Sequence, residues 1–202
     1  MIPLSSHRFF EYSVIASEPR TGPAPTEVSI PRELHVEDYA ALRKFSGLYD
    51  VDYRLVLAIA EHESRFNRSA LSPRGAMGLL QIMPATGREL LTKLNLSDLS
   101  HPAQHLRAGI YYLSKLSNLF SSAPPEQRRR LALAAYNAAP SRIYEAQELA
   151  AYLGEDPDSW SSIRHVLPLL WRRYSSLLAH VWPEGRPPHG CFAGWKETVH
   201  YV

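Results

Sequence analysis

Two glutamates, Glu61 and Glu63, lie in an apolar stretch with the sequence AIAEHESRF, and a carboxyl group can transfer protons in catalysis. The stretch has the apolar spacing of a helix. At about 100° per residue, counted from Val51, Glu63 falls at about 120°, among the apolar side chains, whereas Glu61 falls at about 280°, on the polar side. We therefore expect Glu61 to face solvent and Glu63 to face the protein interior.

Burying Glu63 in its charged form costs several kcal/mol, so the pKa of its carboxyl group should rise. A raised pKa is the property of a general acid that works near neutral pH. Helix geometry leaves two roles open: a structural ion pair or hydrogen bond in the core, or catalysis. His62, at about 20°, is interpreted as a packing or hydrogen-bonded histidine at the edge of the buried face.

The elements that must position these residues are predicted to be helical, so the fold class is mainly α. The sequence from 72 to 87 breaks the periodicity with Gly75, Gly78 and Pro84 and is predicted to be a loop or several turns. We expect Gly47 to cap the end of one helix, Asp50 or Asp52 to cap the start of the next, and Ser100 to cap the start of a third. The predicted helices cover 33–52, 50–66, 100–120, 125–140 and 141–154, with shorter ones in 158–170, 174–182 and 194–202.

The composition indicates a folded domain with an appendage, since the chain has 202 residues, of which 45% are hydrophobic. Residues 1–30 are rich in proline and are predicted to be a tail or linker, and 31–202 to be the domain. The net charge of +2 is too small to favour nucleic acid as a partner. Cys191 is the single cysteine, which excludes an intrachain disulfide. With no export signal or long apolar span, either the protein is not exported or this chain lacks its export sequence.

Three ordered blocks of sequence resemble one known family. The second block is ALAAYNAAP, with Tyr136 and Asn137, and the third is ETVHYV, with Tyr201. The first block matches at Glu63, Ser64, Ser72, Gly75, Ala76, Gly78, Leu79, Leu80, Gln81, Met83 and Pro84. Together they resemble the lysozyme-like lytic transglycosylases of the SLT domain family, which act on bacterial peptidoglycan. The stretch from 145 to 170 is similar to the membrane-bound F type, so the chain is expected to be its catalytic domain or a short relative.

The resemblance implies a lysozyme-like helical fold, related to goose-type lysozyme, with a substrate cleft. It implies that Glu63 is catalytic and that the β-1,4 bond between N-acetylmuramic acid and N-acetylglucosamine is cleaved with formation of 1,6-anhydro-N-acetylmuramic acid. No metal or cofactor is expected. The side chains expected to bind or position the glycan strand are Ser64, Ser72, Gln81, Tyr136, Asn137 and Tyr201.

Two other functions stay open: hydrolysis of the same bond, as in goose-type lysozyme, and an inactive peptidoglycan-binding scaffold. A hydrolase ordinarily needs a second carboxylate, and the matched blocks offer only Glu63. The substrate implies the periplasm or cell envelope of a bacterium, with peripheral envelope association. One departure from the family pattern is Ala139-Pro140, which replaces the usual glycine after Tyr-Asn-Ala, so the cleft edge is expected to differ there.

Overall fold

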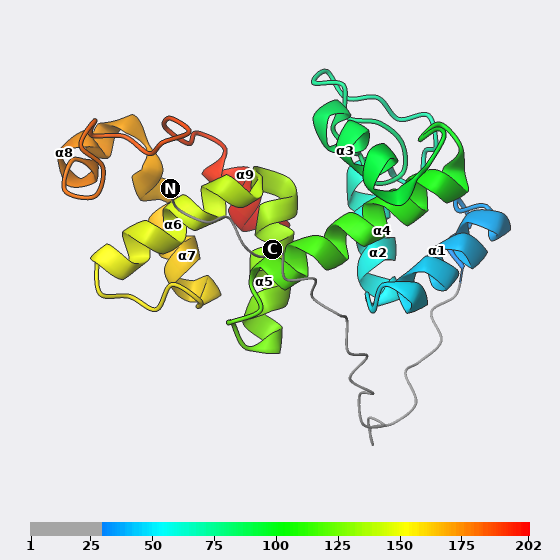
Figure 1. Cartoon of the computed structure of the whole chain (residues 1–202), viewed down its shortest axis with the longest axis horizontal. Helices are drawn as coiled ribbons and strands as arrows, with labels where there is room; N and C mark the ends of the chain where they lie inside the picture. The colour runs from blue at the N-terminus through cyan, green and yellow to red at the C-terminus, as the bar shows by residue number, and fades with distance from the viewer. Residues whose placement is uncertain (1–29) are drawn as a thin grey trace, which may run out of the picture.

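The computed structural model describes residues 30–202, so the tail predicted for 1–30 lies almost wholly outside the described residues and stays a prediction. The described part is mainly helical, as expected, and Figure 1 shows its course. Its α-helices are α1 (Val36–Leu48), α2 (Tyr53–Ser64), α3 (Pro84–Leu94), α4 (Pro102–Leu119), α5 (Pro125–Ala138), α6 (Pro140–Tyr152), α7 (Trp160–Val166), α8 (Ser175–Leu178) and α9 (Trp195–Tyr201).

The helices form two lobes, each with its own hydrophobic core. In Figure 1, α1 to α3 lie on one side and α5 to α9 on the other, with α4 running between them. One core contains Leu106 of α4, and the other contains Leu116 from the same helix. Tyr112 and Tyr136 pack against both cores, with their ring centroids 5.8 Å apart. The long helix α4 therefore joins the lobes, and the tyrosine pair lies where they meet.

Helix α2 places Glu63 in its last turn. Asp52 caps the start, because its side chain accepts a 3.0 Å hydrogen bond from the Arg54 backbone N–H. The helix ends where Arg65 adopts a left-handed conformation with φ of 50°. Its buried face is Val56, Leu57, Ile59 and Ala60. The prediction that the helix buries an apolar face is confirmed at Val56, Ile59 and Ala60, whereas Leu57, which the helical positions place beside Glu61, is buried as well.

Three local predictions were wrong. Helix α3 lies partly in the predicted loop, because Pro84 occupies its first position, where a missing N–H costs nothing. Gly47 lies inside α1 and Tyr49 follows its end. His101, and not Ser100, precedes α4, and it makes no side-chain capping bond.

The sharp junction between α5 and α6 is Ala139, with Pro140 as the first residue of α6. Ala139 has φ of 81° and ψ of 147°, a backbone conformation that is favourable only for glycine. The resemblance described above implies a glycine at this position. The chain therefore keeps the glycine conformation with an alanine, and the conformation strains the backbone.

Candidate active site

The carboxyl group of Glu63 is half-buried and bonded to a side chain from the far end of the sequence. The Tyr201 hydroxyl, in α9, donates a 2.7 Å hydrogen bond to Glu63 Oε1. Glu61, two residues before Glu63 in α2, is exposed. The two glutamates therefore differ in the way that their helical positions predict.

Burial raises the pKa of the Glu63 carboxyl above its ordinary value of 4.5. The hydrogen bond from Tyr201 and the nearby His62 oppose this rise and have smaller effects. Burial and the Glu63 charge also raise the pKa of Tyr201, so this phenol stays protonated and remains a donor. Glu63 thus combines a raised pKa with a fixed orientation, as general acid–base catalysis requires.

His62 packs against the same tyrosine. Its ring lies edge-on to the Tyr201 ring, with centroids 4.9 Å apart, and its side chain is exposed. Its helical position predicted a packing or hydrogen-bonded histidine at the edge of the buried face, and the ring contact with Tyr201 is a packing contact. The contact adds a second constraint on Tyr201 beside its hydrogen bond to Glu63.

The loop between α2 and α3 is held by side chains from three helices. Ser64 Oγ lies 2.9 Å from the Leu79 carbonyl oxygen. The Tyr136 hydroxyl donates to the Leu80 carbonyl oxygen, and the Leu80 N–H donates to His105 Nε2 at 3.1 Å. These bonds satisfy backbone groups that would otherwise be buried without partners. Ser64 and Tyr136 therefore fix the loop next to the acid, and their predicted contact with substrate stays a prediction.

His105 is a residue that the sequence analysis missed. It is 3% exposed, and burial lowers its pKa to about 4, so it is neutral at pH 7 and Nε2 can accept the Leu80 N–H. A Cβ atom at Gly78 would lie 2.7 Å from its Cε1 atom. The sequence shows a histidine on the apolar stripe of α4 and a glycine in the loop, which could have pointed to this contact. Only the fold shows that the two residues lie together.

Ser72 and Gln81 shape the loop through their own side chains. Ser72 Oγ accepts a 2.9 Å hydrogen bond from the Ala76 N–H. Gln81 has φ of 45°, and its side-chain nitrogen donates to the Ala70 and Gly78 carbonyl oxygens at 3.2 and 2.9 Å. The Gln81 amide nitrogen is therefore occupied, which leaves its carbonyl oxygen as the group able to meet a ligand.

Asn137 holds α9 against α5. Its Oδ1 atom accepts a 2.8 Å hydrogen bond from the buried hydroxyl of Thr198, and Thr198 lies in the helix that carries Tyr201. Asn137 thereby supports the junction of the two helices. Its contact with substrate remains a prediction.

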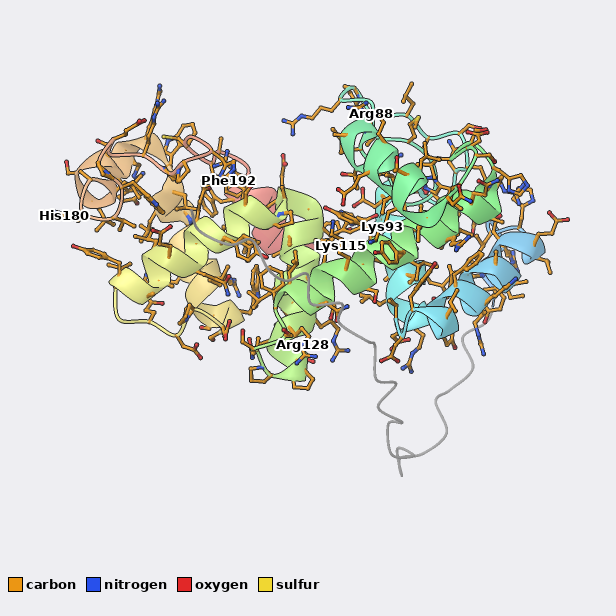
Figure 2. All side chains as sticks on the ribbon, viewed as in Figure 1. Arg88, Lys93, Lys115, Arg128, His180 and Phe192 are labelled. Carbon is orange, nitrogen blue, oxygen red and sulfur yellow. The ribbon has the colours of Figure 1, made fainter. Side chains whose placement is uncertain are left out.

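Glu63 does not line either of two cavities found in the described part of the chain. The larger, about 1280 Å³, is lined by residues of α1 to α5, and the smaller, about 570 Å³, lies between the 67–83 loop and α3. Lys93, Lys115 and Arg128, labelled in Figure 2, belong to the first cavity, and Arg88 to the second.

Within residues 30–202 no group of three His, Cys, Asp or Glu side chains is arranged to hold a metal ion. None of the helices in that range has the length and apolar character needed to span a bilayer.

Comparison with known proteins identifies the family. A model of the transglycosylase SLT domain matches residues 41–157, more than half of the chain. The chain therefore belongs to the transglycosylase SLT domain family, and the resemblance seen in its motifs is confirmed. The contact between Tyr201 and Glu63 joins a residue beyond the matched region to one inside it.

Two curated relatives carry the same protein name. Membrane-bound lytic murein transglycosylase F of Haemophilus influenzae (strain PittGG) is 35% identical over 151 residues, which is 71% of this chain and 30% of that protein. The protein of the same name from Shewanella halifaxensis (strain HAW-EB4) is 33% identical over 165 residues, which is 81% of this chain and 31% of that protein. The chain thus spans about three tenths of the length of these relatives.

The fold is also that of a solved structure, the 70-kDa soluble lytic transglycosylase in complex with bulgecin A. The TM-score is 0.50 and the identity 23%, and the match covers 80% of this chain and 22% of that one. The predicted fold class, mainly α and lysozyme-like, is confirmed.

Proposed function

We propose that this chain carries the catalytic domain of a peptidoglycan lytic transglycosylase, with Glu63 as its acid and base. The observation that carries the proposal is the half-buried Glu63 carboxyl, which has a raised pKa and is oriented by Tyr201. Membership of the SLT family and the names of its relatives support the choice of reaction.

No carboxylate of residues 30–202 is among the groups that shift the pKa of Glu63, and this favours transglycosylation over hydrolysis. Among the described residues, the side chains that shift the pKa of Glu63 are Tyr201 and His62. A glycosidase of the usual kind pairs its acid with a second carboxylate that acts as nucleophile or activates water. With one carboxylate, we propose that the nucleophile comes from the substrate itself.

The reaction then has two proton transfers through one group. Glu63 gives its proton to the leaving oxygen as the bond from that oxygen to C1 of N-acetylmuramic acid breaks. The C6 hydroxyl of the same sugar forms the new bond to C1 and releases its proton to Glu63. The products are a 1,6-anhydro end and a free N-acetylglucosamine hydroxyl, and Glu63 is protonated again without a water molecule being consumed.

The other residues of the site have supporting roles in this proposal. Tyr201 occupies Glu63 Oε1, which leaves Oε2 free to face the glycosidic oxygen. The Gln81 carbonyl oxygen and the Ser72 hydroxyl lie on the loop beside α2 and offer polar groups to the sugars. Glycan strands are thus the proposed partner, and the bacterial periplasm or envelope the proposed location.

Digestion of purified peptidoglycan tests the proposal. Mass spectrometry of the released muropeptides should show anhydro ends, one water lighter than reducing ends. Reducing ends would instead support a hydrolase, and intact sacculi an inactive scaffold. Glu63→Gln should abolish cleavage. Glu61→Gln, the matched control two residues away on the exposed face, should cleave like the unaltered chain.

A further inference from the structure

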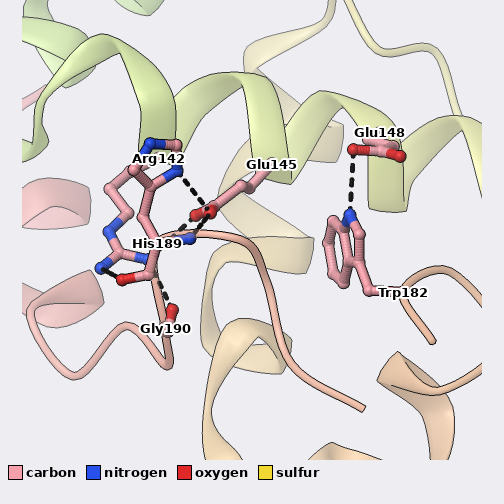
Figure 3. A network of polar contacts seen from close by, with 6 residues as sticks. All are labelled: Arg142, Glu145, Glu148, Trp182, His189 and Gly190. Carbon is pink, nitrogen blue, oxygen red and sulfur yellow. Dashed lines mark hydrogen bonds and ion pairs between the residues drawn. The ribbon is translucent and has the colours of Figure 1, made fainter. Parts of the chain in front are cut away.

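A buried cluster of charge lies on α6, away from Glu63. Glu145 is 3% exposed, and Figure 3 shows its bonds. Its Oε1 accepts the His189 backbone N–H at 2.8 Å and lies 3.0 Å from His189 Nδ1. Its Oε2 accepts from Arg142, one turn earlier in the helix, at 2.9 Å. The carboxylate thereby joins α6 to the segment that leads into α9.

Arg142 binds the same segment at two more points. Its guanidinium donates to the carbonyl oxygens of His189 and Gly190, each at 2.6 Å, and lies 5.4 Å from the centroid of the Phe192 ring. The Phe192 N–H in turn donates to the Leu170 carbonyl oxygen at 2.9 Å. Residues 189–192 are thus fixed mainly through their backbone atoms, which sets the position of the chain as well as of its side chains.

The segment 189–192 shortly precedes α9, the helix that carries Tyr201, the hydrogen-bond partner of Glu63. Helix α9 has seven residues, too few to be a stable helix without tertiary contacts. It is held to α5 by the bond from Thr198 to Asn137, and its last residue bonds the catalytic carboxyl. The position of the first residues of α9 therefore determines whether the Tyr201 hydroxyl can reach Glu63.

We propose that Glu145 and Arg142 are positioning residues for the reaction: by fixing residues 189–192 on α6, they set the placement of α9 and hold the Tyr201 hydroxyl on Glu63. The catalytic meaning of this inference rests on the proposed function, but the effect on the Tyr201–Glu63 bond does not.

Stability alone does not account for the cluster. A buried ion pair often contributes no more than apolar side chains of the same size, so pairing the buried Glu145 with the partly buried Arg142 is not by itself stabilising. The neighbouring Glu148 provides the comparison, because it also bonds the C-terminal part of the chain. Glu148 is exposed, and its carboxylate accepts a hydrogen bond from the Trp182 indole N–H at 3.1 Å (Figure 3). Trp182 precedes the 189–192 segment in the chain, so this bond does not hold that segment.

The test measures the pKa of Glu63 directly, by carboxyl ¹³C NMR titration of the full chain. The variants are Glu145→Gln, which removes the charge paired with Arg142, and Arg142→Lys, which cannot reach both carbonyl oxygens. Glu148→Gln is the matched control. Tyr201→Phe lacks the hydrogen bond to Glu63, so the change that it causes in the pKa of Glu63 is the reference for complete loss of that bond. Circular dichroism and thermal unfolding show whether each variant is folded.

Loss of the Tyr201 hydrogen bond should raise the pKa of Glu63, because that bond favours the charged carboxylate. The other groups that act on this site, His62 and Tyr136, are unchanged in every variant. We expect Glu145→Gln and Arg142→Lys to give at least half of the shift seen with Tyr201→Phe, and Glu148→Gln to give none. Combining Glu145→Gln with Tyr201→Phe should add no further shift.

The same variants should lower the rate of peptidoglycan cleavage about tenfold or more and should move the alkaline limb of the pH profile to higher pH. A folded Glu145→Gln or Arg142→Lys chain with an unaltered Glu63 pKa would overturn the inference. So would failure of both variants to fold, since the cluster would then be a requirement of the fold. If the unaltered chain releases no anhydro muropeptides, the proposed function fails, and the NMR titration still decides the inference.

Discussion

The Tyr201 hydroxyl donates a 2.7 Å hydrogen bond to Glu63 across 138 residues of sequence. The acid comes from α2 of one lobe, and its partner comes from α9 of the other. Each lobe contributes one of the two groups. The orientation of the Glu63 carboxyl therefore depends on how the two lobes are placed relative to each other.

Replacing Tyr201 with phenylalanine should lower the rate of peptidoglycan cleavage about tenfold or more, because a hydrogen bond to a charged group contributes about 1.5–3 kcal/mol. The phenyl ring keeps the edge contact with His62, so packing is retained. The bond lowers the pKa of Glu63, and its loss should therefore shift the alkaline limb of the pH–rate profile upward. Turbidity assays over a pH series would measure both effects, and a profile that keeps its shape would count against this role of Tyr201.

Glu63 should cost the fold stability when it is ionised. Its pKa in the folded state lies above the ordinary 4.5, so the folded chain binds more protons, and stability falls as pH rises from about 4.5 through the raised pKa. Glu63→Gln should therefore unfold at a higher temperature than the unaltered chain at pH 7. The difference should disappear below the ordinary carboxyl pKa. Glu61→Gln, on the exposed face, is the matched control in the same calorimetric series.

The sequence alone predicted the helices well, because apolar side chains that recur every three or four residues indicate a helix with one buried face. It also separated Glu61 from Glu63 by their positions on one helix. Helix α3 was missed because Pro84 and Gly87 usually interrupt helices, whereas here proline starts one and the glycine is buried against Leu99.

The hydrogen bonds of the loop beside the acid and the charged cluster on α6 could not be predicted in the same way. The bond between His105 and Leu80 joins residues 25 apart, and the cluster on α6 joins Glu145 to His189, 44 residues away. Such pairs depend on the placement of whole helices, which periodicity does not specify. The resemblance to a family supplied Tyr201, but not the residues that position it.

Ala139→Gly should stabilise the chain by about 1 kcal/mol. Ala139 holds φ of 81° and ψ of 147°, a region that costs a residue with a Cβ atom about 1–3 kcal/mol, and part of the gain is lost to the greater freedom of unfolded glycine. Its side chain is exposed, so little packing is lost. Urea unfolding would measure the change. Ala58→Gly, at an exposed position inside α2, should instead lose about 1 kcal/mol, and a loss at both sites would show that Ala139 is unstrained.

Gly109→Ala should destabilise the chain, although alanine is the better helix former. Gly109 lies in α4 against Leu80, and an added Cβ atom would overlap the Leu80 side chain. Overpacking costs about 1–3 kcal/mol, more than the roughly 1 kcal/mol that alanine contributes to a helix. Because Leu80 also bonds Tyr136 and His105 through its backbone, its displacement should lower cleavage activity as well.

Gly47→Ala is the matched control for Gly109→Ala. Gly47 also lies in a helix, α1, but an added Cβ atom there would meet no other atom within 4 Å. It should raise the unfolding temperature, by the gain of about 0.5–1 kcal/mol expected for alanine over glycine, and leave cleavage unchanged. If both substitutions raise the unfolding temperature, then the contact between Gly109 and Leu80 does not limit the packing of the loop beside Glu63.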